Sequence, residues 1–199
     1  RLFWINYDYE WHPECLLSVY GFKTVVDILL GEPMPKVETI GIREYAEKKR
    51  SSAVGEGETP EDVVTQIEES VRRIAVALGE LDSIGSTRSA GGELRCTYLD
   101  LRSWQSLGSY YGKKLRAAME LADYLVSGEE ACREAAVELL REAVEDWKAL
   151  SLVWSEHYLP YRLVRSKYVF GYPYYLDDVR DDVERAKAVD IEHNNPFLR

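Results

Sequence analysis

The most regular pattern of hydrophobic and polar positions lies between residues 60 and 84. Apolar side chains recur there at spacings of three and four residues: Val64, Ile67, Val71, Ile74, Leu78 and Leu81. Such spacing places them on one face of a helix. Thr59 suits the N-cap and Pro60 the first helical position, so the pattern predicts a long amphipathic helix that begins at residue 60.

Two further long helices are predicted downstream. The first spans about residues 93–126, and Gly108 and Gly112 fall on its apolar stripe. Each glycine costs about 1 kcal/mol of helix propensity relative to alanine, so we expect a neighbouring backbone or a bulky aromatic to pack closely there. The second begins after the connection at 127–130 and ends at about Leu159, before a proline.

Shorter elements flank these helices. A fourth helix is predicted over about 175–190, because apolar residues again recur at helical spacing. Near the N-terminus, residues 13–21, 22–31 and 40–50 each predict a short helix. Residues 1–11 alternate at period two, which is typical of an extended segment.

These elements together predict an all-α protein. We expect an antiparallel bundle of three long helices plus a fourth, with a short-helix N-terminal subregion. Residues 1–58 would form the extended segment and short helices, and residues 59–199 the long-helix bundle, as one compact unit. The chain starts at Arg1 without an initiator methionine, so we expect it to be a segment of a longer protein.

Composition narrows the possible partners. The chain has 199 residues, of which 46% are hydrophobic and 30% charged, which is typical of a soluble globular protein. The net charge of −10 argues against a nucleic-acid partner. The sequence shows no secretory signal peptide and no apolar run near the roughly 20 residues that cross a membrane, so we expect no membrane partner.

An acidic motif near the C-terminus is the first candidate for chemistry. Asp177, Asp178 and Asp181 fit the D-D-x-x-D pattern with which all-helical diphosphate enzymes hold magnesium. Such a site needs carboxylates from two facing helices, and the sequence shows no second acidic box. The aspartates also suit the first turn of a helix, where Asp177 can pair with Arg180, and Asp181 with Arg185.

A carboxylate pair near the N-terminus is a weak candidate for glycoside chemistry. Asp8 and Glu10 lie on one side of the predicted extended segment and could act as acid and base or nucleophile. Two such side chains on one strand lie about 6–7 Å apart and nearly parallel. A glycosidase instead places its carboxylates on opposite sides of the scissile bond. The histidines and cysteines show no ligand or nucleophile pattern, so we expect no cofactor.

Aromatic residues are concentrated at both ends of the chain. Eight lie between residues 154 and 175, and a second set stands near the N-terminus. Tyrosine and tryptophan combine a ring that can be buried with a polar group, so they suit mutual packing, an interface or a platform for sugar rings. The candidates for ligand or partner contact are Trp11, Tyr158, Tyr161, Tyr172, Tyr174 and Tyr175.

Several segments resemble a known group of proteins. They are EWHPE (10–14), YGFKTVVDILLG (20–31), YYGKKLRAAMELA (110–122), and a helix of pattern A-x-x-x-L-L-x-x-A-x-x-x-W that closes with YLP (158–160). Together they resemble the helical region downstream of catalytic (β/α)-barrels in large bacterial carbohydrate-active proteins of the glycoside-hydrolase kind. The resemblance spans about residues 4–190, and it carries no catalytic residue over to this sequence.

The resemblance implies a non-catalytic accessory module that supports a barrel or extends its substrate cleft. Its partners would be the adjacent catalytic domain of the same polypeptide and possible carbohydrate ligands. If the chain belongs to an enzyme, that enzyme would be a glycoside hydrolase. The second hypothesis is a stand-alone interaction or dimerisation bundle that uses the aromatic residues. The third is a diphosphate-binding all-helical enzyme.

Overall fold

A computed structural model gives the fold of the protein. It describes residues 17–18, 21–31, 39–51, 57–83, 92–162 and 169–198. Within these ranges there are six α-helices, and the strands are four segments of two residues each. The protein is therefore all-α, as the hydrophobic pattern predicts.

The four helices predicted from the sequence periodicity are all present. They are α3 (Pro60–Ser83), α4 (Glu93–Ser127), α5 (Glu130–His157) and α6 (Leu176–Ala188). Thr59 caps α3: its hydroxyl accepts a hydrogen bond from the Asp62 N–H at 3.2 Å, and its own N–H donates to the Asp62 carboxylate at 2.9 Å. This reciprocal cap satisfies two backbone donors where the helix begins.

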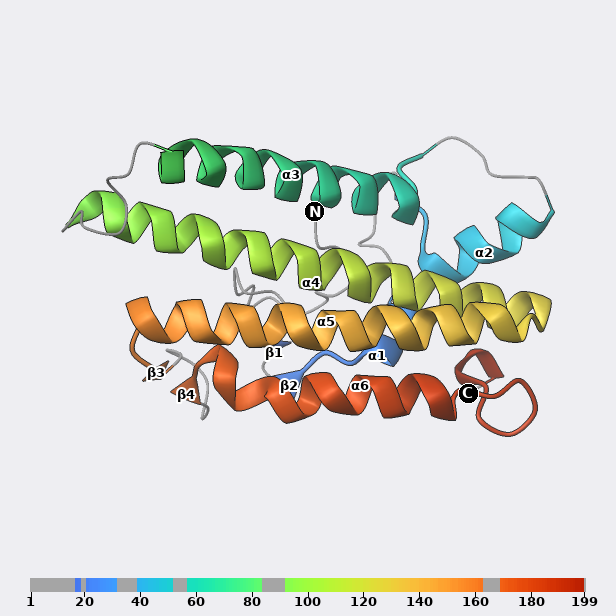
Figure 1. Ribbon diagram of the computed structural model, residues 1–199. Coiled ribbons are helices and arrows are strands. Elements are labelled where there is room, and N and C mark those ends of the chain that lie inside the picture. The colour runs from blue at the N-terminus through green and yellow to red at the C-terminus, as the bar shows by residue number, and fades with distance from the viewer. Residues whose placement is uncertain are drawn as a thin grey trace.

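The three long helices and the shorter α6 lie side by side in chain order, and neighbours run antiparallel (Figure 1). Helix α4 contacts both α3 and α5, and α6 contacts α5. The short helices α1 (Val25–Leu29) and α2 (Ile42–Arg50) both contact α4, and α1 also contacts α6. Helix α4 is thus the element on which most of the others pack.

The N-terminal subregion differs in part from the prediction. The helix expected over 13–21 is wrong in the part that is described, where Leu17–Ser18 (β1) pairs antiparallel with Gly21–Phe22 (β2). An isolated helix of two turns is marginal in water, and the strand pairing instead places Phe22 against Trp147, with ring centroids 6.3 Å apart. The predicted extended segment over 1–11 lies outside the described residues.

The other two short helices are confirmed. Helix α1 is shorter than the predicted 22–31, and a capping box between Thr24 and Asp27 begins it. Helix α2 agrees with the prediction over 40–50.

A second small hairpin joins α5 to α6 and was not predicted from the sequence. Tyr161–Arg162 (β3) pairs antiparallel with Val169–Phe170 (β4). A 3-10 helix, η1 (Tyr172–Tyr175), follows and leads directly into α6. A further 3-10 helix, η2, covers Pro196–Leu198. The hairpin and η1 bring the aromatic stretch back onto the end of α5.

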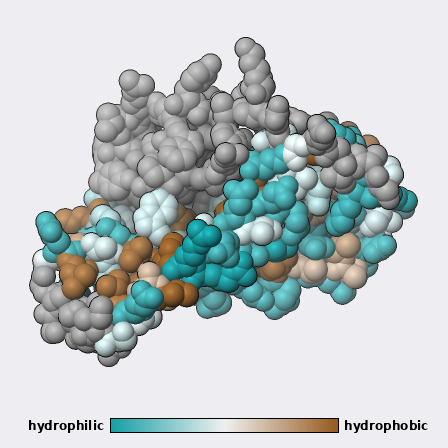
Figure 2. Space-filling model, turned by 90° about the horizontal axis from the view of Figure 1, so that it is seen from above, coloured by the Kyte–Doolittle hydropathy of each residue, from teal (hydrophilic) through white to brown (hydrophobic). Residues whose placement is uncertain are grey.

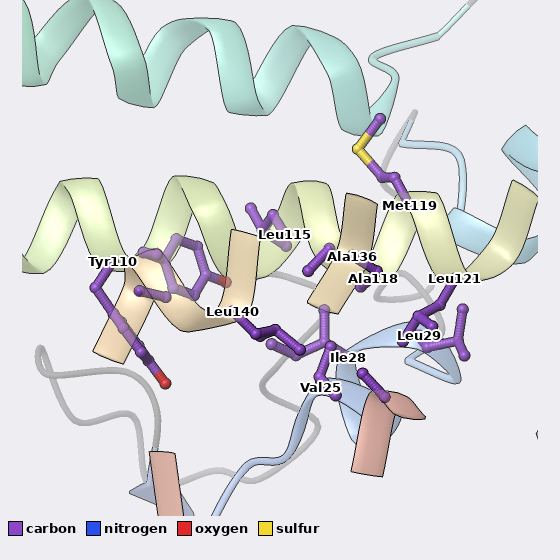
Figure 3. Packing of buried hydrophobic residues seen from close by; sticks show 14 of the residues in the cluster. Val25, Ile28, Leu29, Tyr110, Leu115, Ala118, Met119, Leu121, Ala136 and Leu140 are labelled. Atoms are coloured by element: carbon purple, nitrogen blue, oxygen red, sulfur yellow. The ribbon is translucent and has the colours of Figure 1, made fainter. Parts of the chain in front are cut away.

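The core lies where α4, α5 and α1 meet. Figure 3 shows Val25 and Ile28 of α1 close to Leu140 of α5, below the α4 ribbon. All three of these side chains are almost completely buried. Burying aliphatic side chains of this size contributes roughly 1.5–3 kcal/mol each, so this junction holds α1 on the long helices.

The two stripe glycines of α4 face α3. A Cβ added at Gly108 would lie 2.7 Å from Cγ2 of Val71, and one added at Gly112 would lie 3.5 Å from Cγ2 of Ile67. Close approach is therefore confirmed at Gly108, whereas Gly112 leaves room for an ordinary contact. The approaching groups are β-branched aliphatic side chains of α3 rather than a backbone or an aromatic ring.

Candidate functional site

Aromatic side chains from α4, α5 and η1 form one continuous cluster. The Trp147 ring lies 4.7 Å from the ring of Tyr110 and 5.2 Å from that of Tyr172, between centroids. Trp154 lies 5.9 Å from Tyr172 and 6.0 Å from Tyr158. We call this group, with Phe22 and Tyr175, the aromatic cluster. It runs from the protein interior at Tyr110 to the surface at Tyr158.

The sequence of α5 accounts for the axis of the cluster. Trp147 and Trp154 are seven residues apart and therefore lie on one face of the helix. The indole N–H of Trp147 donates a hydrogen bond of 2.9 Å to the backbone oxygen of Tyr172. Because a buried donor without a partner is costly, this bond both satisfies Trp147 and fixes η1 against α5.

A buried ion pair closes the inner end of the cluster. Lys114 of α4 and Asp182 of α6 are 0% and 1% exposed, and Lys114 Nζ lies 2.7 Å from Asp182 Oδ2. The ammonium also lies 3.1 Å from the Tyr110 hydroxyl and 4.0 Å from the Phe22 ring centroid. Asp182 Oδ1 accepts a hydrogen bond of 3.0 Å from the N–H of Val25, in the first turn of α1. The pair therefore joins three helices.

Burial controls the ionisation of these groups. Desolvation lowers the pKa of the Lys114 ammonium, and the neighbouring Asp182 carboxylate opposes that shift. Desolvation also raises the pKa of the Tyr110 hydroxyl well above its ordinary value, and the charge of Asp182 adds to the effect. Because the pair is enclosed by protein, its role is to join helices rather than to meet a ligand.

The pairing of Lys114 with Asp182 was not predicted from the sequence, although the helical positions of both residues indicate that they are buried. Lys114 lies four residues after Tyr110 and one before Leu115, on the buried face of α4. Asp182 lies three residues after Val179 on the buried face of α6. A lysine and an aspartate on apolar faces indicate charges that need a buried partner. The periodicity alone does not say that the two are partners of each other.

Two tyrosines are exposed at the outer end of the cluster. Tyr158 is 42% exposed and Tyr174 is 60% exposed, whereas Trp154 is only 5% exposed. A Cβ added at Gly171 would lie 3.1 Å from the Tyr174 ring and 3.2 Å from the Trp154 ring, so both rings close on this glycine. Of the two exposed tyrosines, Tyr158 thus stacks on the buried Trp154, and Tyr174 lies near Trp154 at Gly171.

A carboxylate and a histidine complete the outer end. The Tyr158 hydroxyl donates a hydrogen bond to Oδ1 of Asp100 on α4. The same carboxylate oxygen lies 3.2 Å from Nε2 of His157. The His157 and Tyr158 rings are 4.3 Å apart between centroids. The beginning of α4 and the end of α5 therefore meet at Asp100. We call Asp100, His157, Tyr158 and Tyr174 the outer site.

The other tyrosine candidates lie in different surroundings. Tyr172 is buried between Trp147 and Trp154. Tyr175 is half-buried and stacks on Phe22 at 6.4 Å. Tyr161 belongs to β3, opposite Phe170. Trp11, Asp8 and Glu10 lie outside the described residues, so their suggested roles stay predictions.

The acidic motif forms the first turn and a half of α6. Asp177 pairs with Arg180 at 3.0 Å, and Asp181 lies 3.9 Å from Arg185. Asp178 is partly buried, and desolvation raises the pKa of its carboxyl. The following residue of the run, Asp182, turns inward to Lys114. Among the described residues, no three or more His, Cys, Asp or Glu side chains are grouped so that they could hold a metal ion.

A shallow hollow of about 550 Å³ lies between α5 and α6. Arg133, Glu138, Arg141 and Lys187 are among the side chains around it. Arg141 pairs with Glu138 at 2.9 Å, and Lys187 pairs with Glu184 at 2.7 Å. Because these cations are already paired with carboxylates, the hollow has little free positive charge with which to bind a ligand.

In the described parts of the chain, no helix has the length and apolar character needed to cross a membrane.

Comparison with known proteins identifies a similar fold but no family. No protein-family model matches the sequence, and a search of curated proteins gives no match either. Among solved structures, the fold is similar to that of a GH138 enzyme targeting pectin rhamnogalacturonan II, with a TM-score of 0.60 and 19% identity. The match covers 74% of this chain and 22% of that chain. At this identity the likeness concerns the fold alone, and the chain spans about a fifth of that enzyme's length.

Proposed function

We propose that this chain is a non-catalytic helical module of a carbohydrate-active protein, and that the outer site contacts carbohydrate. The observation that carries the proposal is the pair of exposed tyrosines: Tyr158 stacks on the buried Trp154, and Tyr174 lies near it at Gly171. An exposed aromatic face suits the apolar face of a sugar ring, and the tyrosine hydroxyl suits its polar edge.

The rigid support of these rings favours binding. Ordering a side chain on binding costs about 0.5–1.5 kcal/mol. Tyr158 is already held by its hydrogen bond to Asp100 and by stacking on Trp154, so less of that cost remains. A flexible surface tyrosine without such contacts would bind more weakly for the same contact area.

The fold likeness suggests which ligands and partner to test. The similar solved structure is that of an enzyme targeting a pectin, and the likeness covers only 22% of its chain. We therefore infer that pectic saccharides are the first ligands to test. We also infer that the partner is an adjacent catalytic domain of the same polypeptide, which supplies the catalytic carboxylates while this module supports it or extends its substrate cleft.

Calorimetric titration with pectic oligosaccharides tests the proposal. Tyr158→Ala and Tyr174→Ala should each weaken binding about tenfold, which corresponds to about 1.4 kcal/mol. Tyr174→Phe is the matched control, because it keeps the ring and should bind nearly as well as the unaltered chain. Absence of binding to any pectic oligosaccharide would contradict the proposal. So would turnover of aryl glycosides by this chain that Glu10→Gln abolishes.

A second candidate function is a stand-alone interaction or dimerisation bundle. Trp104 of α4 is 53% exposed, and Val76 of α3 is also exposed. Figure 2 shows apolar side chains gathered toward the end where α3 finishes and α4 begins. Contiguous exposed apolar surface marks protein interfaces in many proteins. A dimer that forms in sedimentation experiments at micromolar concentration, without any affinity for saccharides, would favour this candidate.

A further inference from the structure

Asp100 is the polar counterpart of the exposed tyrosine rings. Its Oδ1 accepts the hydrogen bond from the Tyr158 hydroxyl and lies 3.2 Å from Nε2 of His157. Its other oxygen, Oδ2, has no hydrogen-bond partner among the described residues, and the side chain is 40% exposed. One carboxylate oxygen is therefore fixed by two neighbours, and the partly exposed side chain lies beside the exposed Tyr158 ring.

This pairing matches the surface of a sugar unit. A sugar ring presents an apolar face of C–H groups and an edge of hydroxyl donors. An ionised carboxylate only accepts hydrogen bonds, so Oδ2 of Asp100 suits hydroxyl donors. Hydrogen bonds to an ionised acceptor are roughly twice as strong as neutral ones. A few well-placed polar groups of this kind set orientation and specificity in ligand sites.

The charge of Asp100 also sets a preference between sugar classes. We propose that Asp100 makes the outer site selective for uncharged sugar units over uronic acids. A uronic acid would bring a second carboxylate beside Asp100, and like charges in contact disfavour binding. This inference rests on the proposed function, because it assigns the substrate class of the same site.

Tyr158 then has two separable roles. Its ring supplies a stacking face, and its hydroxyl fixes the orientation of the Asp100 carboxylate. Tyr158→Phe removes the second role and keeps the first. We expect this variant to retain binding of uncharged saccharides with a loss of about threefold, smaller than that of Tyr158→Ala, because the contribution of a single hydrogen bond is modest.

A matched pair of ligands tests the inference. Trigalacturonate and its fully methyl-esterified form share one backbone stereochemistry and differ in charge. Calorimetry at neutral pH should show that the esterified form binds at least about tenfold more tightly to the unaltered chain. In Asp100→Asn the affinity for the esterified form should fall, and the preference should shrink to within about threefold. Glu156→Gln removes one exposed carboxylate beside His157 and should leave the preference unchanged.

Each outcome of this experiment decides something different. Equal affinities for the two ligands, or a preference that survives Asp100→Asn, would overturn the selectivity while the proposed function stood, provided that Tyr174→Ala still weakened binding. Failure of both ligands and of every other pectic oligosaccharide to bind a chain whose circular dichroism is unchanged would remove the proposed function, and this inference with it. Failure of the two trigalacturonates alone would overturn this inference. A preference lost equally in Glu156→Gln and Asp100→Asn would show a general effect of net charge, and would also overturn the assignment to Asp100.

Discussion

The two halves of α4 differ sharply in their surroundings. Over Glu93–Ser109 the buried residue is Leu99. Over Tyr110–Ser127 the buried residues are Tyr110, Tyr111, Gly112, Lys114, Leu115, Ala117, Ala118, Met119, Leu121, Ala122, Tyr124 and Leu125. Both halves belong to one continuous helix, so the difference comes from what packs on them. The second half pairs with α2 through Asp123, with α3 through Arg116 and with α5 through Lys113. The first half meets α3 at Gly108 and α5 at Asp100.

This contrast separates stability from recognition. The second half holds the buried Lys114 and nearly all of the buried residues of α4, so changes there should alter the free energy of unfolding. The first half presents Asp100 and Trp104 at the surface, so changes there should alter binding and leave the fold intact. Recognition groups placed on an otherwise rigid helix keep a defined geometry, which favours selective binding.

The largest expected effect on stability is in the second half of α4, at Lys114. Lys114→Met would leave Asp182 as a buried charge without its partner, so we expect a loss of about 3–5 kcal/mol in the free energy of unfolding. Chemical denaturation followed by circular dichroism measures it. Lys113→Met is the matched control, because Lys113 makes partly exposed pairs with Asp146 and Glu142 and should lose less than about 1 kcal/mol. If Lys114→Met and Lys113→Met lost the same free energy of unfolding, the buried pair would contribute no more than a partly exposed one, which would contradict this account.

The next effect concerns the glycines that face α3. Gly108→Ala gains about 1 kcal/mol of helix propensity, but its Cβ would meet Val71 at 2.7 Å. The Val71 side chain is β-branched and cannot rotate away easily, and overpacking typically costs about 1–3 kcal/mol. We expect a net loss of about 1 kcal/mol in thermal unfolding.

Gly112→Ala should instead stabilise the protein. Its added Cβ would lie 3.5 Å from Ile67, which is an ordinary contact. This variant should therefore gain up to about 1 kcal/mol. If both alanine variants were stabilised by the same amount, α3 would not approach α4 as closely at Gly108 as the geometry indicates.

A smaller effect is expected at the polar edge of the same interface. Arg116 of α4 bridges Glu68 at 2.7 Å and Glu61 at 3.1 Å, both on α3. These side chains are more than a third exposed, so solvent screens the pairs, and Arg116→Ala should cost only about 0.5–1 kcal/mol and less at high salt.

The same bridge predicts a pH dependence. The hydrogen bond from Arg116 lowers the pKa of the Glu68 carboxyl below its ordinary 4.5 in the folded state. The contribution is therefore fully present above that value, and it is lost as the pH falls through the lowered pKa. Denaturation curves between neutral and acidic pH should converge for the unaltered chain and Arg116→Ala. A constant difference down to pH values well below 4.5 would contradict the assignment to Glu68.

The smallest effect on stability is expected in the first half of α4. Trp104 is largely exposed, so Trp104→Ser should change the free energy of unfolding by no more than about 0.5 kcal/mol. The same variant should reduce any self-association seen by sedimentation. A loss of stability as large as that of Lys114→Met would show that the first half is packed by a neighbour in solution.

The long helices could be predicted because their signals are local. Spacing of apolar residues and the cap at Thr59 depend only on neighbours in the sequence, and the helix beginning at Pro60 follows from them. The close approach at Gly108 was also predictable, because two glycines on an apolar stripe need a packing reason. The identity of the approaching side chain, Val71, depends on the register between α3 and α4 and could not be read from spacing.

Pairings between residues on different helices could not be predicted from the sequence pattern. The i,i+4 spacing would allow Glu68 to pair with Arg72, but Glu68 binds Arg116 of α4, and Arg72 pairs with Glu69 at 2.8 Å. A bidentate partner on the next helix competes successfully with a weak exposed pair on the same helix. The candidate site shows the same limit: Tyr172 and Tyr174 are two residues apart, yet one is buried and the other exposed.

The most direct test of the central claim is a residue-resolved titration of the ¹⁵N-labelled chain with methyl-esterified trigalacturonate. We predict that amide shifts are concentrated at Asp100, Tyr158 and Tyr174, and that the second half of α4 is unchanged. Tyr174→Ala should weaken the response at Tyr158 and Asp100 as well, because the ligand spans the site. Shifts centred on another surface, or none at millimolar ligand, would contradict the account.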